Sequence, residues 1–448
     1  MAIDFTLTKE QKEIQARARA FAQEVLAPVT RQVDAEPDPL TAFQLTKPAY
    51  AEACKRGIAF SMLPRTYGGG GLSNVDFVIA AEEIQAVDPG FGTTVLVNGL
   101  GLLPVWYYGT EEQKERFISA ATADTSNEFI VGYAASEPAG SPGGTANFDA
   151  PAVDGAGMAV TATLDGDEYV VNGRKYWPCN VGGWDNEGAH INLVVVRTDA
   201  GAGGTAGLSA LMIERGTPGI TYRSISTLGQ RSTPNCEIIF DNARVPAVNM
   251  LEGAKGNGDL LINRNFAWSG PVAGIGAVAI ARAAYEDALQ WAKTYTAGGP
   301  KPIIHYQYPG YVLGDVAAKI EAARYFCWKA AHYLDQHDYH GEMLGAMCKV
   351  HCTEMLFDAV YKCMQVVGVN SVDNQHQFGH YLREAAILPV YDAGNFGMQR
   401  RRVHGVMADA TFNPRAVMDD EAIEFTKAME GIDTVPGPTA DERTPVAA

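Results

Sequence analysis

The stretch ILPVYDAGNFGMQRRR (387–402) carries the carboxylate that is best placed to do chemistry. An apolar run from Ile387 to Tyr391 leads into Asp392, and two small residues follow it. A carboxylate in such surroundings is poorly solvated, so we expect its pKa to be raised towards neutrality. It could then act as a general base that removes a proton from a weakly acidic C–H group. The alternative is that Asp392 only caps a helix beginning near Asn395, which is the commoner use of Asp in a turn.

Composition describes a large acidic globular protein. The chain has 448 residues, of which 47% are hydrophobic and 19% charged, and its net charge is −17. This length can bury a large core divided into two or three subdomains. The negative charge argues against a nucleic-acid partner, although it does not exclude an anionic small ligand.

The sequence also predicts no membrane partner and a cytoplasmic location. No apolar run approaches the roughly 20 residues that cross a bilayer, and the first residues lack the apolar segment of a signal peptide. The seven cysteines show no CxxC spacing, and their one CxxH spacing, Cys348 to His351, is not followed by a second ligand pair. This pattern is typical of reduced thiols in a cytosolic compartment. Cys348 and Cys352 have helical spacing but no second ligand pair follows them. We therefore predict packed helix residues and no metal site.

The hydrophobic period divides the chain into helices, strands and helices again. Residues 1–128 are predicted to be helical, with a capping box at Thr8 and Gln11 and a further helix start at Thr110. Residues 129–247 hold short β-rich runs between Gly, Asp and Pro turns, and Asp165-Gly166 marks a hairpin. Such runs predict an antiparallel barrel or sandwich.

Long helical patterns return in residues 248–432 and predict a C-terminal helical bundle. The remaining residues, 433–448, are rich in Pro and Thr and are predicted to be a disordered tail. No GxGxxG motif follows a strand, so the pattern does not favour a Rossmann nucleotide site.

Four strings in this order resemble the acyl-CoA dehydrogenase superfamily of flavoproteins, from about residue 4 to residue 405. They are GTEEQKERF (109–117), GYAASEPAGSPGG (132–144), YVVNGRKYWPCN (169–180) and LGQRSTPNCEIIFDNARVP (228–246). The resemblance implies an α+β fold with an N-terminal helical domain, a central antiparallel β-barrel or sandwich domain and a C-terminal four-helix bundle. It also implies bound FAD.

The resemblance further implies which residues contact the cofactor. Trp177 would cover one flavin face, and Cys179 would lie near flavin N5, where the family usually has Thr. A thiol is a weaker donor than a hydroxyl. The remaining implied contacts within one chain are Tyr133, Ala135, Ser136, Gly140, Ser141 and Asn395.

Other family contacts come from a neighbouring subunit. The segments matching Gln307 and Gln365 to Gly368 contact the FAD of a second chain in the family, so a homotetramer, or at least a dimer, is expected. The family's arginine for the pyrophosphate corresponds here to Thr296 or Ala297, and this contact is therefore not carried over.

Asp392 lies where medium- and short-chain members carry their catalytic Glu. The longer- and branched-chain members place their base on an earlier helix, and that position is Ser269 here, which cannot serve alone. Nitroalkane oxidases, a branch of the superfamily, use Asp at this position with a neighbouring Ser that matches Ser269. Their arginine seven residues after the base is replaced by Gln399, and Arg400 is expected to supply the missing charge.

Three functions follow from these resemblances. The leading interpretation is α,β-dehydrogenation of an acyl-CoA thioester, with electrons passing from FAD to an electron-transfer flavoprotein. The alternative is oxidation of a nitroalkane or another small carbon acid without CoA, with oxygen as the acceptor. A non-catalytic flavin-binding scaffold is the third, and a titratable Asp392 argues against it.

Overall fold

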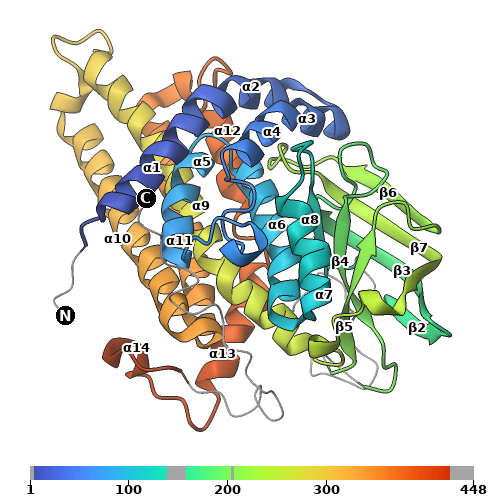
Figure 1. The fold of residues 1–448 in the computed structure, drawn as a ribbon. Coiled ribbons are helices and arrows are strands. Elements are labelled where there is room, and N and C mark those ends of the chain that lie inside the picture. The colour runs from blue at the N-terminus through green and yellow to red at the C-terminus, as the bar shows by residue number, and fades with distance from the viewer. Residues whose placement is uncertain (1–4, 139–157, 203–205, 424–448) are drawn as a thin grey trace.

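The computed structural model describes residues 5–138, 158–202 and 206–423, and it begins with a set of helices (Figure 1). The predicted capping box at Thr8 and the predicted helix start at Thr110 are confirmed. The Oγ1 atoms of these residues accept hydrogen bonds from Gln11 N and Gln113 N, each at 3.2 Å. The N-terminal helices are α1 (Lys9–Phe21), α2 (Ala27–Ala35), α3 (Pro39–Leu45), α4 (Lys47–Lys55), α5 (Asn74–Gln85), α6 (Pro89–Tyr108), α7 (Glu111–Lys114) and α8 (Ala120–Thr122).

One curled seven-stranded sheet follows, with strand order β1-β4-β2-β3-β7-β6 and with β5 paired to β4. The predicted hairpin at Asp165-Gly166 is confirmed by antiparallel pairing of Asp165 with Glu168. The strands are β1 (Val131–Ala134), β2 (Thr161–Asp165), β3 (Glu168–Cys179), β4 (Ile191–Arg197), β5 (Leu208–Glu214), β6 (Ile220–Ile225) and β7 (Asn235–Pro246).

The expectation of purely antiparallel pairing is wrong at two places. β4 pairs in parallel with β1, where Val131 faces Ile191, and with β2. Parallel neighbours need a long connection, and the chain between β1 and β4 supplies one. Strand β4 is buried on both faces: Leu193 and Val195 join the core shared with the helices, whereas Val194 and Val196 join a separate core inside the sheet.

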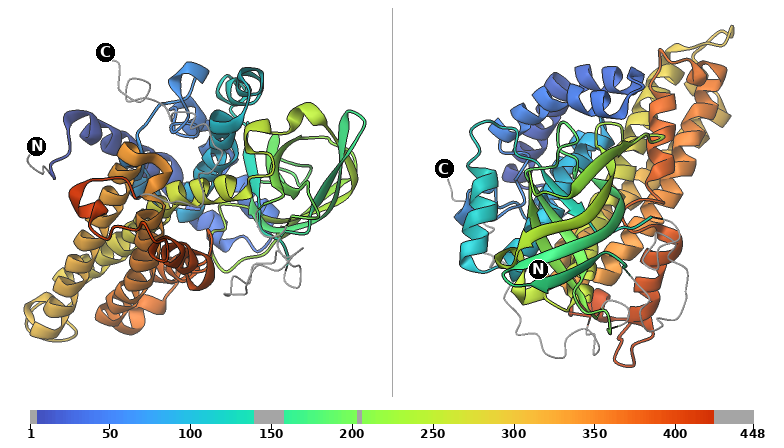
Figure 2. Two further views of the ribbon diagram at one scale, coloured as in Figure 1. Left: turned by 90° about the horizontal axis from the view of Figure 1, so that it is seen from below. Right: turned by 90° about the vertical axis from the view of Figure 1, so that its right-hand side faces the viewer.

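Long helices complete the fold and project away from the sheet (Figure 2). Small residues let α9 and α11 approach closely, since a Cβ atom on Gly270 would lie 2.4 Å from the carbonyl oxygen of Gly345. The C-terminal helices are α9 (Gly258–Thr294), α10 (Gln307–His337), α11 (Glu342–Val367), α12 (Phe378–Ile387), α13 (Arg400–Met407) and α14 (Ala416–Asp419). The predicted tail, 433–448, lies outside the described residues.

Part of α9, Arg264–Thr294, is long and apolar enough to cross a membrane by length and composition alone. Within its most apolar window, however, 89% of the residues are buried inside the protein. Burial of this kind is what a helix at the centre of a bundle requires, so the length of α9 is weak evidence for a membrane span.

Candidate active site

Asp392 lies in a tight turn between α12 and α13. Asp392 and Ala393 both have left-handed backbone angles, with φ of 49° and 57°. A short π-helix, η9 (Asn395–Gln399), follows, and its N-cap residue is Gly394, without any side-chain cap. The helix-cap interpretation of Asp392 is therefore wrong.

The carboxylate of Asp392 instead faces α9. The hydroxyl group of Ser269, which is fully buried, lies 2.9 and 3.1 Å from the two carboxylate oxygens and donates its proton to them. Burial raises the pKa of Asp392, and the charge of Lys349, the hydrogen bond from Ser269 and the charge of Arg402 only partly offset this increase. The residue as a whole is only partly buried. A carboxylate that is desolvated, oriented and accessible suits a general base.

Tyr133 on β1 presents a polar group without a partner to this region. Its ring is buried, yet its hydroxyl has no hydrogen-bond partner among the described residues, and Asn265 approaches it without completing a bond. Burial and the nearby charge of Asp392 both raise the pKa of Tyr133. An orphan hydroxyl beside Asp392 fits a site that binds a polar cofactor or substrate, since buried polar groups are normally satisfied.

The predicted flavin-facing residues of β3 lie at a break in the sheet. The register between β3 and β7 shifts between Tyr176 and Cys179, and Trp177 adopts a left-handed φ of 80°. The indole of Trp177 is 44% exposed, which is unusual for so large a ring and leaves a flat aromatic face open to a planar cofactor. Burial, together with the charge of Asp392, raises the pKa of Cys179 to about 12, so this side chain stays a neutral thiol.

The loop after β1 is tied to the same strand. The backbone N–H of Tyr176 donates to the carbonyl of Ser136 at 3.0 Å, and Lys175 Nζ donates to the carbonyl of Ala135 at 3.0 Å. Lys175 also pairs with Glu137 at 3.1 Å, and both side chains are buried. This ion pair could not be predicted from the sequence, although its members lie in the strings 132–144 and 169–180. Gly140 and Ser141 lie outside the described residues.

Of the remaining predicted cofactor contacts, Asn395 lies beside the turn of Asp392, whereas Gln307, Gln365 and Gly368 lie far from it. The amide of Asn395 bonds Lys349 and Thr353 at 2.9 and 2.8 Å, so its contact with a cofactor stays a prediction. Gln307 begins α10 and Gln365 and Gly368 end α11, so they lie at one end of an antiparallel helix pair. That end is roughly 24 Å from Lys349 at 1.5 Å per helical residue. Within one chain these residues cannot reach the site of Asp392, and their role across subunits also stays a prediction.

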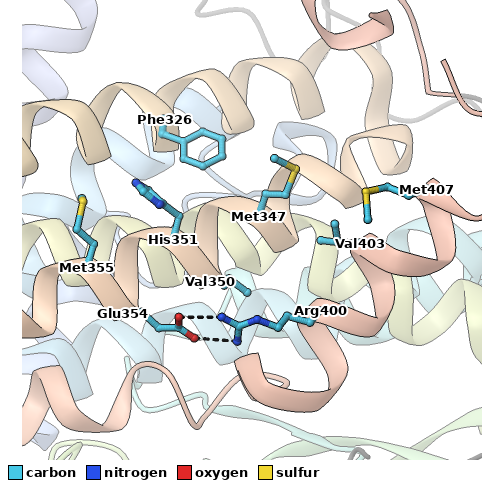
Figure 3. Close-up of a pocket in the computed structure, with 9 residues that line it drawn as sticks. All are labelled: Phe326, Met347, Val350, His351, Glu354, Met355, Arg400, Val403 and Met407. Carbon is cyan, nitrogen blue, oxygen red and sulfur yellow. Dashed lines mark hydrogen bonds and ion pairs between the residues drawn. The ribbon is translucent and has the colours of Figure 1, made fainter. Parts of the chain in front are cut away.

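Arg400 does not supply a charge to Asp392, and this expectation is wrong. Its guanidinium forms a two-pronged ion pair with Glu354, with N–O distances of 2.8 and 2.9 Å, at the rim of a surface groove (Figure 3). The positive groups that act on Asp392 are Lys349 and Arg402, both of which are buried. Gln399, at the position of the family arginine, donates from Nε2 to the backbone carbonyl of Asp392 at 3.0 Å.

Three buried thiols form a separate group in the helical bundle. The sulfur of Cys327 lies 3.4 Å from that of Cys348 and 3.8 Å from that of Cys352. Among the described residues the group offers only three ligand atoms, whereas structural zinc sites use four. The three cysteines are small side chains that fill the buried space between α9, α10 and α11, and this packing accounts for their proximity.

Comparison with known proteins places this geometry in a family. The profiles of the acyl-CoA dehydrogenase N-terminal, middle and C-terminal domains match residues 8–124, 148–243 and 256–408. A nitroalkane oxidase of Fusarium oxysporum is 31% identical over 434 residues, covering 92% of this chain and 97% of that protein. A cyclohex-1-ene-1-carbonyl-CoA dehydrogenase of Syntrophus aciditrophicus is 30% identical, with coverage of 87% and 88%.

A solved structure agrees with the sequence comparison. The structure of a nitroalkane oxidase active-site variant crystallized with 1-nitrooctane has a TM-score of 0.86 and 29% identity, covering 94% of this chain and 100% of that one. The similarity therefore extends over all three parts of the fold, including the region that contains Asp392.

Proposed function

This chain belongs to the acyl-CoA dehydrogenase family of FAD-dependent oxidoreductases, and on that premise we propose that it oxidises a small carbon acid such as a nitroalkane. The observation that carries the proposal is the pairing of Asp392 with the hydroxyl of Ser269 at 2.9 and 3.1 Å. Asp392 would take a proton from the carbon next to the activating group. FAD, when bound, supplies the acceptor for two electrons.

The chain's own residues give each step a physical basis. Ser269 donates to the carboxylate and so holds its free lone pairs towards the accessible side of the site. The orphan hydroxyl of Tyr133 can donate to an oxygen of the substrate or to the cofactor. Trp177 offers its exposed ring to the flavin face, and the loop held by Lys175 and Glu137 would lie along the flavin edge.

Two features favour a small carbon acid. Asp392 is one methylene shorter than the Glu of most dehydrogenases in the family. In addition, the nitroalkane oxidase relative matches more of this chain than the CoA dehydrogenase does. A nitroalkane is acidic enough to lose its proton without a thioester clamp, and an oxidase of this kind would pass electrons from FAD to oxygen.

Dehydrogenation of an acyl-CoA is the second candidate. It was the leading interpretation of the sequence, and a CoA dehydrogenase at 30% identity supports it. Its electron acceptor would be an electron-transfer flavoprotein.

Anaerobic flavin bleaching separates these candidates. Purified holoprotein would be mixed with short nitroalkanes and, separately, with a panel of acyl-CoAs, and flavin absorbance would be followed. We expect rapid bleaching by nitroalkanes and rapid reoxidation by air. Bleaching by acyl-CoAs alone would establish the second candidate, and FAD that no substrate bleaches would indicate a scaffold.

Assembly and location are part of the same proposal. We propose a homotetramer that is located in the cytoplasm. In such an assembly Gln307, Gln365 and Gly368 of one chain would contact the FAD of a neighbouring chain, because they lie too far from Asp392 to reach the FAD of their own chain. Sedimentation of the holoprotein at micromolar concentration tests this assembly, and a monomer that retains FAD would contradict it.

A further inference from the structure

We propose that Lys349 is a positioning residue for Asp392, closing the turn that carries the carboxylate at both ends and supplying the unneutralised positive charge that faces it. This inference rests on the proposed role of Asp392 as the base. It assigns Lys349 a function that the sequence analysis did not give it.

The contacts of Lys349 define the turn. Its Nζ atom donates to the carbonyl of Leu388 at 3.3 Å and to the side-chain oxygen of Asn395 at 2.9 Å. These partners stand on either side of the turn from Pro389 to Gly394. The ammonium also lies 5.8 Å from the ring centre of Tyr391, the residue before the base. One side chain of α11 therefore fixes the entry and the exit of the turn.

The burial of Lys349 strengthens its electrostatic interaction with Asp392. The side chain is completely buried, and its hydrogen-bond partners among the described residues are two neutral oxygens. A buried ammonium without a carboxylate in contact is costly, so such a residue needs a compensating charge near by. The charge of Asp392 is the largest influence that keeps Lys349 protonated against burial, which lowers its pKa to about 8.

The second buried cation is already neutralised. Arg402 pairs with Glu342 at 2.7 Å and donates to Gln399 at 2.9 Å, and Gln399 in turn holds the backbone carbonyl of Asp392. The link through Gln399 thus fixes the backbone of Asp392. Lys349 hydrogen-bonds only neutral oxygens among the described residues, so its positive charge acts mainly on the carboxylate of Asp392. In agreement, Lys349 lowers the pKa of Asp392 more than Ser269 or Arg402 does.

Other titratable groups near Asp392 and Lys349 differ from this pair in their partners or in the pH at which they ionise. Glu354 on α11 also acts on Lys349, but Arg400 pairs with it at the surface. Tyr391, Tyr133 and Cys179 face Asp392 from the turn, from β1 and from β3, and burial raises the pKa of each of them well above neutrality. Between pH 5 and pH 9 these three stay neutral. Glu384 on α12, whose pKa burial raises to about 7, also titrates in this range, but it acts on Tyr391 and is not among the groups that shift the pKa of Asp392 or Lys349. Its titration should therefore be the same in the wild type and in variants of Lys349.

The test compares Lys349→Met and Lys349→Arg with Lys319→Met. Lys319 on α10 is the matched control because its ammonium forms an ion pair at the surface, with Asp358 of α11. Each holoprotein is reduced anaerobically by nitroethane, and the reduction rate per bound flavin is measured from pH 5 to pH 9. Flavin content and melting temperature report folding separately.

For Lys349→Met we expect the acid limb of the profile to move to higher pH, because Asp392 loses the cation that favours its ionised form. The rate at neutral pH should fall by up to about 100-fold, as for a displaced catalytic group. Lys349→Arg should keep the acid limb at the wild-type pH. Lys319→Met should change neither the pH of the acid limb nor the reduction rate.

Three outcomes would overturn the inference. A slower Lys349→Met with an unmoved limb would mean that Lys349 is merely structural. A wild-type rate and limb in this variant would give Lys349 no role. If Lys349→Met does not fold, Lys349→Arg decides, because a limb at the wild-type pH supports a role for charge and a displaced limb contradicts it. Asp392→Asn serves as the separate check of the base, since its wild-type activity would refute the proposed function itself.

Discussion

Replacement of Asp392 by Asn should stop proton removal while leaving the site assembled. The two side chains have nearly the same shape, and the hydroxyl of Ser269 can donate to an amide oxygen as it does to the carboxylate at 2.9 Å. Gln399 holds the backbone of residue 392 and does not depend on its charge. We therefore expect normal FAD content. The melting temperature should fall by a few degrees, because buried Lys349 loses the charge that compensates it.

The expected size of the effect follows from the loss of general-base catalysis. An amide cannot accept the proton, and a positioned base contributes about 10²- to 10⁴-fold. At about 1.36 kcal/mol per tenfold change in rate, the barrier should rise by about 2.7 to 5.4 kcal/mol. Water in the partly accessible site can replace the base only poorly, so the residual rate should depend little on pH.

Stopped-flow reduction of the flavin under anaerobic conditions measures this step directly. Neutral nitroethane and its preformed anion would be compared, because the anion has already lost the proton that Asp392 removes. The variant should react slowly with the neutral form and at nearly the wild-type rate with the anion. Reduction by neutral nitroethane at the wild-type rate would show that Asp392 is not the base, and equal slowing with both forms would show that the site itself is disturbed.

Three further predictions concern the length of the Asp392 side chain, its hydrogen bond with Ser269, and the residues expected to contact the flavin. Asp392→Glu, measured by turnover, should lower nitroalkane oxidation steeply because the longer side chain misplaces the carboxylate, whereas retained activity on acyl-CoA would favour a dehydrogenase. Ser269→Ala should move the acid limb of the pH profile to higher pH, because a hydrogen bond that lowers the pKa of Asp392 is lost; an unmoved limb would contradict the contact. Trp177→Ala should weaken FAD retention in gel filtration and Cys179→Thr should keep FAD but alter the reduction rate, and unchanged values in both would mean that neither residue contacts the flavin.

Local chemistry explains which parts of the fold could be read from the sequence. The capping boxes at Thr8 and Thr110 and the turn at Asp165-Gly166 each depend on neighbouring residues, and the structure contains all three. The parallel pairing of β1 with β4 depends on residues about 60 positions apart, such as Val131 and Ile191, which no local pattern records. The hydrophobic run of β4 was visible, but not the two separate cores that it serves.

The helix that follows Asp392 shows why the inward-facing arginine, Arg402, could not be identified from the sequence. In η9 the N–H of Gln399 bonds the carbonyl of Gly394, five residues earlier, which inserts an extra residue into the turn. Each added residue rotates the following side chains by about 100° around the helix axis. The spacing of the run Arg400 to Arg402 in the sequence therefore does not by itself show which of these arginines faces the interior.

Lys349 was hidden for a different reason. In the sequence it is an ordinary polar position in a helix, where lysine is nearly always exposed. Only the packing of the 387–395 segment over α11 buries it. Once Lys349 is buried, its positive charge can stabilise the negative charge that is present before the proposed proton transfer and the one that is present after it. In the proposed reaction, the negative charge lies on Asp392 before the transfer and on the deprotonated carbon acid after it. Both positions lie in the same low-dielectric site, so a fixed cation stabilises the base at the start and the anion at the end without any side chain having to move.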